Sequence, residues 1–483
     1  MHLSNTVRVG ISIAVGALFF FILSATMDLD NWWYLSGGRL ISEQHDVPRL
    51  DNASFVVQNF PIIDHEWLPN WLLWLAWSND LWVLAVLVAT ACASIPFIVW
   101  IFRARSWVDI WIIVCAVASM IFFVSMRNYL ISFALFFVVS EILRMRYEVG
   151  AVSKYFLFMP IIFFLWANTH GGFVIGLVLW VVYVGTYYGL ERQRDYAWQD
   201  FLIFFISVAL TFVNPYGWRL YEEVIGANVS RAVLGYIKEW RPGFEIVSFF
   251  GAFFVGLVMS VCVLWRKRVR PIIIAPVVLF FIFFMKLARM GPFFYLISIP
   301  LLFSVSEDIR PHISRKILSI LFFGVFVYIT FFIVTLERPP LPSAQAVESL
   351  RNTDRGNTWN DFEWGSVLRF YIPEKKIFID SRMGRWADAR GVSVLQTYAD
   401  VLTVPQYWKK VFYDYNIDTV FLARRIDDGG KNFVERWFAF AEYSPDVDLE
   451  RELIRDDWEV VYQDSTAIVL QYRGKGICEE YGR

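Results

Sequence analysis

Polar residues suited to acid–base chemistry are concentrated near the N-terminus, in residues 28–70, between two apolar runs. Asp28 and Asp30 stand at the start of this stretch, and His65 and Glu66 stand near its end. A carboxylate can act as a general base by taking the proton from an acceptor hydroxyl. Loops of this length between compact elements are usually functional. The sequence therefore predicts a catalytic loop in which Asp28 or Asp30 is the base.

The same four side chains are also candidate ligands of a metal ion. Carboxylates and histidine, as in Asp28, Asp30, His65 and Glu66, suit Mg²⁺ or Mn²⁺. Their spacing does not show whether they converge, so a metal-bound site and a metal-free site both stay open. The four cysteines offer neither a CxxC metal site nor a disulfide framework.

A second set of polar residues lies at the ends of apolar runs, far along the chain. Guanidinium and ammonium groups hold phosphate by charge-assisted hydrogen bonds and stabilise charge on a departing phosphate. Together with His65 and Glu66, the predicted substrate-binding residues are Arg127, Asn168, His170, Asn214, Glu239, Arg241, Lys286 and Arg289.

Each of these residues also has a structural interpretation. Arg127 and Arg289 could mark a membrane interface by snorkelling, and Asp28 could be a charge in the first turn of a helix. His170 lies in a turn-like segment before Gly171-Gly172 and could make a structural hydrogen bond, while Glu239 and Arg241 could form an ion pair. For Trp32, Trp33 and Trp67, an aromatic belt and a sugar-binding platform are equally open.

The composition indicates a membrane protein. Of the 483 residues, 57% are hydrophobic and 19% aromatic, with a mean hydropathy of +0.48. The net charge of −1 gives no indication of nucleic-acid binding. The first apolar run lacks a cleavage pattern, so we expect it to be retained as a helix. We predict a transmembrane domain at 1–336 that carries the outer catalytic loop 28–80, and an extracytoplasmic domain at 337–483.

The apolar runs and their charged flanks predict a topology. Runs near membrane-spanning length predict about eleven helices, at 9–27, 81–102, 108–125, 129–144, 155–169, 172–190, 198–213, 249–265, 271–286, 290–305 and 317–336. With the N-terminus in the cytoplasm, every inside loop is basic. Loop 28–80, the C-terminal domain and the polar set above then lie on the outer side, which indicates binding or chemistry at one membrane surface.

The C-terminal region has the pattern of a small α/β domain. After a proline-rich linker at 337–342 we expect four helices near 343–351, 361–371, 405–415 and 431–443, strands at 376–380 and 418–422, and a hairpin at 457–463 and 466–472. Asp380 and Arg382 follow the first strand, where they could bind a ligand or form a strand-end ion pair.

The order of several short motifs resembles the GT-C superfamily of membrane glycosyltransferases, and more closely a bacterial group of multi-pass membrane proteins. The motifs are Asp28-Leu-Asp30-Asn-Trp-Trp33, His65-Glu66-Trp67-Leu68, Arg127-Asn128, Trp166-Ala-Asn168-Thr-His170-Gly-Gly172, Asn214-Pro-Tyr-Gly217, Glu239-Trp240, Ala288-Arg289, Asn360-Asp361-Phe-Glu-Trp364-Gly365 and Phe378-Ile-Asp380-Ser-Arg382. The superfamily resemblance implies that an acidic residue of the first outer loop, Asp28 or Asp30, is the base or orients the acceptor. Tyr34 stands where the bacterial group often has histidine.

These observations predict an inverting glycosyltransferase of GT-C-like polytopic α-helical fold in the bacterial cytoplasmic membrane. It would move a sugar from a polyprenyl-phosphate donor to a glycan, lipid or protein acceptor at the outer face. One alternative is a ligase or polymerase of lipid-linked oligosaccharides. Another is a non-enzymatic transporter or envelope-assembly scaffold; a transporter should show inverted repeats and broken helices, and the sequence shows no internal repeat.

Overall fold

The computed structural model describes residues 3–25, 27–150, 154–193, 197–226, 238–336, 340–354, 356–424 and 447–474. The chain forms two compact units. One, the helical unit, comprises Met1–Met27, His65–Gly226 and Lys238–Arg338. The other, the sheet unit, comprises Asp28–Asp64, Ala227–Ile237 and Pro339–Arg483.

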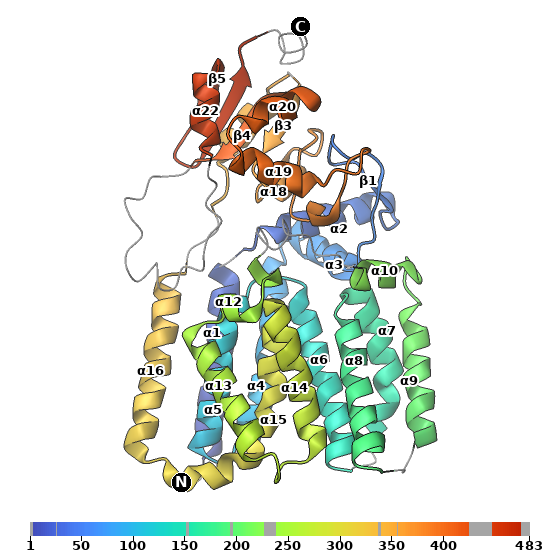
Figure 1. Cartoon of the computed structure of the whole chain (residues 1–483), viewed down its shortest axis with the longest axis vertical. Helices are drawn as coiled ribbons and strands as arrows, with labels where there is room; N and C mark the ends of the chain where they lie inside the picture. The colour runs from blue at the N-terminus through green and yellow to red at the C-terminus, as the bar shows by residue number, and fades with distance from the viewer. Residues whose placement is uncertain are drawn as a thin grey trace. The chain divides into compact units, whose positions relative to one another are not determined.

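The helical unit is a bundle of helices that lie side by side (Figure 1). Its α-helices are α1 (Asn5–Ala25), α3 (Trp67–Ser78), α4 (Trp82–Arg103), α5 (Trp107–Met120), α6 (Tyr129–Leu143), α7 (Met159–Thr169), α8 (Phe173–Val184), α9 (Ala197–Thr211), α10 (Arg219–Ile225), α12 (Gly243–Ile246), α13 (Phe249–Leu264), α14 (Pro271–Lys286), α15 (Gly291–Ile309) and α16 (Arg315–Val334). Short 3-10 or π-helical segments are η1 (Ile121–Phe123), η2 (Arg144–Glu148), η3 (Lys154–Phe158), η4 (Gly185–Leu190), η5 (Lys238–Trp240), η6 (Ala288–Met290) and η7 (Arg310–His312).

Several of these helices can cross a membrane. Among the described residues, five helical segments have the required length and apolar composition: Asn5–Ala25, Trp82–Arg103, Phe173–Leu190, Ala288–His312 and Arg315–Val334. Every predicted apolar run contains a helix, and the number of runs that cross stays a prediction. In α16 only 11% of the apolar window is buried, which fits a helix that faces lipid.

Close packing around Trp166 fixes the end of α7 within the bundle. Trp166 is fully buried and lies against Phe163 of the same helix, with ring centroids 5.8 Å apart. Gly176 of α8 faces this indole, and a Cβ atom at position 176 would stand 2.4 Å from the Trp166 ring. Because Gly176 has no side chain, α8 can approach the Trp166 indole closely. This packing holds Trp166, which belongs to the polar cluster described below, in place.

The sheet unit contains a mixed sheet with helices packed against it. In its described part the strands are β1 (Leu50–Asp51), β2 (Phe60–Pro61), β3 (Asn357–Asn360), β4 (Ile417–Ala423), β5 (Trp458–Gln463) and β6 (Ala467–Tyr472). The larger sheet has the order β3-β4-β6-β5, with β3 and β4 parallel and the other pairs antiparallel. The helical elements are α2 (Asp30–Gln44), α17 (Ala344–Arg351), α18 (Gly365–Tyr371), η8 (Met383–Arg385), α19 (Val394–Thr403), α20 (Tyr407–Asp414) and α22 (Leu449–Arg455).

Residues 28–64 are part of the sheet unit, whereas the sequence analysis assigned them to an outer loop, 28–80, of the predicted transmembrane domain 1–336. Ile377 forms parallel bridges to Thr358 of β3 and to Ser54. The Ile377 amide donates to the Ala53 carbonyl at 2.9 Å, and the Phe55 amide donates to the Ile377 carbonyl at 3.3 Å. Backbone pairing between segments this far apart leaves no local pattern in the sequence. Hydropathy therefore grouped the loop with the apolar runs that flank it in the chain.

The C-terminal elements agree in part with the prediction. Helices α17, α18 and α20, strand β4 and the β5–β6 hairpin lie within a few residues of the predicted ranges. The predicted strand 376–380 forms isolated bridges at Ile377 instead of a regular strand. The prediction did not include β3, α19 or α22, and the helix expected at 431–443 lies outside the described residues.

Candidate functional site

The two candidate bases lie at the start of α2 in the sheet unit. The Asp30 amide donates to Oδ1 of Asp28 at 3.0 Å, an Asx-type turn that leads into the helix. The Asp28 carbonyl oxygen accepts from the Asn31 amide and from its side-chain Nδ2, both at 3.0 Å. Asp28 therefore has the helix-starting role that the sequence left open beside catalysis.

Asp30 instead makes a contact with a distant part of the sheet unit. The Ser381 hydroxyl donates to Oδ1 of Asp30 at 2.8 Å. One residue before Asp30, the Leu29 carbonyl accepts from the Ser366 hydroxyl at 3.0 Å. Two serines of the C-terminal region thus hold the segment that carries the candidate bases.

A buried ion-pair cluster, comprising Asp51, Arg369, Asp380 and Arg382, lies in the same unit. Arg369 and Arg382 each place an Nη1 atom 2.6 Å from Oδ2 of Asp51, and Arg382 also pairs with Asp380. Burial alone would raise the pKa of Asp51, but the charges of Arg382 and Arg369 outweigh it and hold that pKa well below its ordinary value. Asp380 and Arg382 thus form an ion pair, one of the two predicted alternatives, although the segment before them forms isolated bridges instead of a strand.

The second polar centre is in the helical unit, and we name it the helical cluster. Its members are His65, Glu66, Asn128, Ser132, Trp166 and His170. Oε1 of Glu66 lies 3.2 Å from Nε2 of His170 and 3.9 Å from Nε2 of His65. Burial alone would raise the pKa of Glu66, but His170, His65 and a hydrogen bond with Asn128 outweigh it and lower that pKa. Glu66 is therefore a buried carboxylate.

The hydrogen bonds around His170 define its tautomer. The Gly172 amide lies 2.8 Å from Nδ1 of His170, and a backbone amide can only donate. Nδ1 is therefore the acceptor, and Nε2 carries the proton that His170 donates to Glu66. The Ser132 hydroxyl lies 2.8 Å from the same Nδ1 and accepts from Nε1 of Trp166 at 2.6 Å. This network is consistent with the structural interpretation of His170 and links it to Glu66.

His65 is the more accessible imidazole of the helical cluster. Its side chain is 33% exposed, and its ring meets that of His170 edge-on at 5.8 Å between centroids. Burial lowers the pKa of His65, and the charges of His170 and, to a smaller extent, Arg289 lower it further against the opposing charges of Glu66 and Glu223. The imidazole is therefore neutral at neutral pH and can both accept and donate a proton.

The predicted cations are held in different ways. Nη1 of Arg127 lies 2.8 Å from Oε2 of Glu239, an ion pair that the sequence did not anticipate. The guanidinium of Arg289 lies 5.0 Å from the centroid of the Trp240 ring, a cation–π contact. The Arg241 carbonyl accepts from the Ala288 amide at 2.8 Å, and Lys286 is an exposed residue at the end of α14. Of these, Arg289 is the cation whose charge acts on His65.

Asn168 and Asn214 bond to the backbone. Nδ2 of Asn168 donates to the carbonyls of Phe164 and Val213, both at 2.9 Å. Asn214 donates to the carbonyls of Thr211 and Gly217 at 2.8 and 3.1 Å, and its Oδ1 accepts from the Tyr216 amide. Both amides thus stabilise turns at helix ends, and their contact with a substrate stays a prediction.

The four predicted metal ligands do not form one group within either unit. Within the described ranges, no group of three or more His, Cys, Asp or Glu side chains could hold a metal ion. Asp28 and Asp30 belong to the sheet unit, while His65 and Glu66 belong to the helical unit. The carboxylates of Asp28 and Asp30 accept hydrogen bonds from the Asp30 amide and the Ser381 hydroxyl, respectively, so the metal site stays a prediction.

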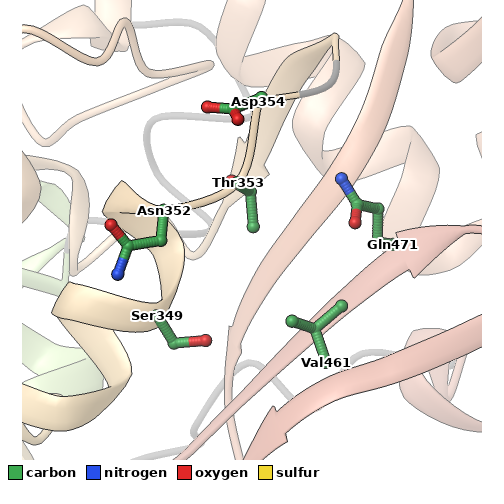
Figure 2. Close-up of a pocket in the computed structure, with 6 residues that line it drawn as sticks. All are labelled: Ser349, Asn352, Thr353, Asp354, Val461 and Gln471. Carbon is green, nitrogen blue, oxygen red and sulfur yellow. The ribbon is translucent and has the colours of Figure 1, made fainter.

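The sheet unit also has a polar pocket of about 360 Å³ between the end of α17 and strands β5 and β6 (Figure 2). Hydroxyl, amide and carboxylate groups dominate its lining, which suits a ligand that is bound through hydrogen bonds. The lining residues are Ser349, Asn352, Thr353, Asp354, Val461 and Gln471, and none of them was predicted as a site residue.

Several residues that shape these centres were not predicted as site residues, although some of them stand in the motifs given above. Ser132 and Asn128 lie in or beside the apolar helix α6, where a polar residue is the available signal. Ser366, Ser381, Asp51 and Arg369 carry no comparable signal, because their partners lie more than 300 positions away in the sequence.

No protein-family model and no curated relative matches the sequence. Among solved structures, the chain is similar to an archaeal oligosaccharyltransferase, AglB from Archaeoglobus fulgidus, solved in complex with an inhibitory peptide and a dolichol-phosphate. The TM-score is 0.58 at 10% sequence identity, and the match covers 94% of this chain and 72% of that one. The similarity shows that this chain shares the fold of that protein over most of its length.

Proposed function

We propose that this protein is an inverting glycosyltransferase that moves a sugar from a polyprenyl-phosphate donor to a glycan, lipid or protein acceptor. The proposed location is the outer face of a bacterial cytoplasmic membrane, with the N-terminus in the cytoplasm. The observation that carries the proposal is the fold similarity, which extends over 94% of the chain to a protein solved with a dolichol-phosphate. Helices able to span a membrane support it independently.

In the proposed reaction, a carboxylate of the sheet unit is the general base. Asp30 takes the proton of the acceptor hydroxyl while the acceptor oxygen bonds to the anomeric carbon. The bond between that carbon and the donor phosphate oxygen breaks, and its electron pair leaves with the polyprenyl phosphate. Attack from the face opposite the phosphate inverts the anomeric centre.

Phosphate binding is proposed separately for groups of the helical unit. Arg289 offers a fixed cation, oriented by its contact with Trp240. His65 offers an N–H donor, and Glu66, itself held by His170, fixes the local arrangement of charge. The remaining predicted residues, Arg127, Asn168, Asn214, Glu239, Arg241 and Lys286, are proposed to support this region, mostly through the structural contacts described above.

A transfer assay with defined donors tests the proposal. The purified full-length protein is incubated with synthetic decaprenyl-phosphate glucose, mannose and galactose and a membrane-derived glycan and lipid extract. We expect one donor to yield a sugar-labelled product together with released decaprenyl phosphate. The double variant Asp28→Asn/Asp30→Asn should yield neither. Wild-type product levels from a stably inserted double variant would overturn the assignment.

Transfer of a whole oligosaccharide is a second candidate, because the similar solved structure is an oligosaccharyltransferase. This ligase-type activity predicts that monosaccharide donors are inert and that a decaprenyl-diphosphate oligosaccharide is consumed with attachment of the intact glycan. A transporter or scaffold predicts no covalent product from either donor class. One assay with both donors therefore separates the three functions.

A further inference from the structure

A tight turn at residues 380–382 of the sheet unit has two fixed ends. The Arg382 amide donates to Oδ1 of Asp380 at 2.9 Å, and Nε of Arg382 lies 3.1 Å from Oδ2 of the same carboxylate. Arg382 is held a second time by Asp51 at 2.6 Å. Asp380 is fully buried. Because both neighbours of Ser381 are restrained, the position of its hydroxyl is well defined.

This hydroxyl is aimed at a candidate base. Ser381 donates to Oδ1 of Asp30 at 2.8 Å across 351 positions of sequence. Close packing of the backbone supports the same arrangement, because a Cβ atom on Gly365 would stand 2.0 Å from the Ile379 carbonyl oxygen. The next residue, Ser366, bonds to the Leu29 carbonyl. The 380–382 turn and the start of α18 therefore hold the residues around Asp30 together.

The contacts of Asp28 and Asp30 differ in kind. Oδ1 of Asp28 accepts from the backbone only two residues away, which stabilises the start of α2. Oδ1 of Asp30 accepts from a side chain in another part of the unit. A short aspartate side chain still rotates about two torsions, and a catalytic group must be held to within about 0.5 Å of its productive position. A hydroxyl donor on one oxygen restrains this rotation.

We propose that Ser381 is a positioning residue that orients the Asp30 carboxylate for proton transfer. The C-terminal part of the chain then takes part in catalysis through Ser381, in addition to its structural role. The inference rests on the proposed glycosyltransferase function and names Asp30, in preference to Asp28, as the base. The acceptor proton moves to Asp30 as described above, and Ser381 neither gains nor loses a proton in that step.

The test compares three full-length variants in the decaprenyl-phosphate transfer assay. Ser381→Ala removes the donor, and we expect kcat to fall about 10- to 100-fold while KM for the donor stays within about twofold. Ser381→Thr keeps a hydroxyl and should recover most of the wild-type kcat. Ser465→Ala, an exposed serine of the same unit away from this turn, is the matched control and should leave kcat unchanged.

Thermal melting of each variant separates positioning from folding. A Ser381→Ala protein with wild-type melting and lowered kcat supports the proposal, and wild-type kcat overturns it. If Ser381→Ala does not fold, Ser381→Cys keeps the volume with a weaker donor, and wild-type kcat in that variant overturns the proposal as well. If Asp30→Asn is inactive while Ser381→Ala is fully active, only the positioning role fails. If the wild-type protein transfers no sugar from any donor, the proposed function itself fails.

Discussion

The two units build their polar centres from different chemistry. The ion-pair cluster of the sheet unit places two guanidiniums on one carboxylate, Asp51, whose side chain is 1% exposed. The helical cluster has one carboxylate, Glu66, which lies beside Nε2 of the buried His170 and beside the partly exposed imidazole of His65. The first arrangement restrains two distant segments, and the second leaves a proton-active group accessible. This difference indicates that the ion pairs assemble the sheet unit, while the helical cluster is suited to contact a ligand.

The largest predicted stability effect comes from breaking the ion-pair cluster. Asp51→Ala leaves Arg369 and Arg382 without their shared carboxylate, and loss of one partner of a buried ion pair costs about 3–5 kcal/mol. We expect a clear loss of melting temperature for the full-length protein and early proteolysis within residues 28–64. Asp354→Ala, at an exposed carboxylate of the same unit, is the control. Equal melting of the two variants would contradict a structural role for the cluster.

A smaller effect is expected from crowding the helical cluster without changing its charge. Gly176→Ala places a methyl group against the buried Trp166 ring, and overpacking of this kind costs about 1–3 kcal/mol. The displaced indole should also disturb Ser132 and His170, which tryptophan fluorescence can report. Gly185→Ala is the matched control, because a Cβ atom there has no neighbour within 4 Å. The contact with Trp166 is unimportant if both variants melt alike.

The smallest predicted effect is a pH dependence that distinguishes the two centres. The pKa of His65 in the folded protein lies below its ordinary value of 6.5. As the pH falls, His65 is therefore protonated in the unfolded chain before it is protonated in the folded chain. The stability contribution of His65 is therefore complete above about pH 6.5 and decreases as the pH falls toward the lower folded-state pKa. The pKa of Asp51 is also lowered, so its contribution is lost only below about pH 3.8.

Melting temperatures at pH 7.5 and pH 5.5 for the wild type and His65→Gln measure this contribution. Burial raises the pKa of Glu148 to about 7, which favours the folded state as the pH falls, so the difference between the two proteins isolates His65. We expect the wild type to lose more stability than His65→Gln between these pH values. An identical loss in both proteins would show that His65 does not titrate with a lowered pKa.

The sequence predicted the helices well because a membrane-spanning helix is encoded locally. Each predicted apolar run contains a helix, since a long hydrophobic stretch satisfies its backbone within the segment. The pairing of Asp380 with Arg382 was also accessible, because the two residues are two positions apart.

The assembly of the sheet unit was not accessible in the same way. Strand β3, Asn357–Asn360, is short and polar and has no alternating apolar pattern, although Thr358, Trp359 and Asn360 are buried. The contact of Ser381 with Asp30 and the bridge of Ser54 to Ile377 join segments more than 300 positions apart. Hydropathy therefore located the candidate bases but not the elements that hold them.

The transfer rate of Asp30→Asn relative to Asp28→Asn tests the central claim most directly. Both variants keep an oxygen acceptor and similar volume, and the assay follows decaprenyl phosphate released by the full-length protein. With Asp30 as the base, Asp30→Asn should lower kcat about 10²- to 10⁴-fold. Asp28→Asn should lower kcat less, because Oδ1 of Asp28 accepts a hydrogen bond within the local turn at the start of α2. Wild-type kcat in a folded, inserted Asp30→Asn protein would contradict the account.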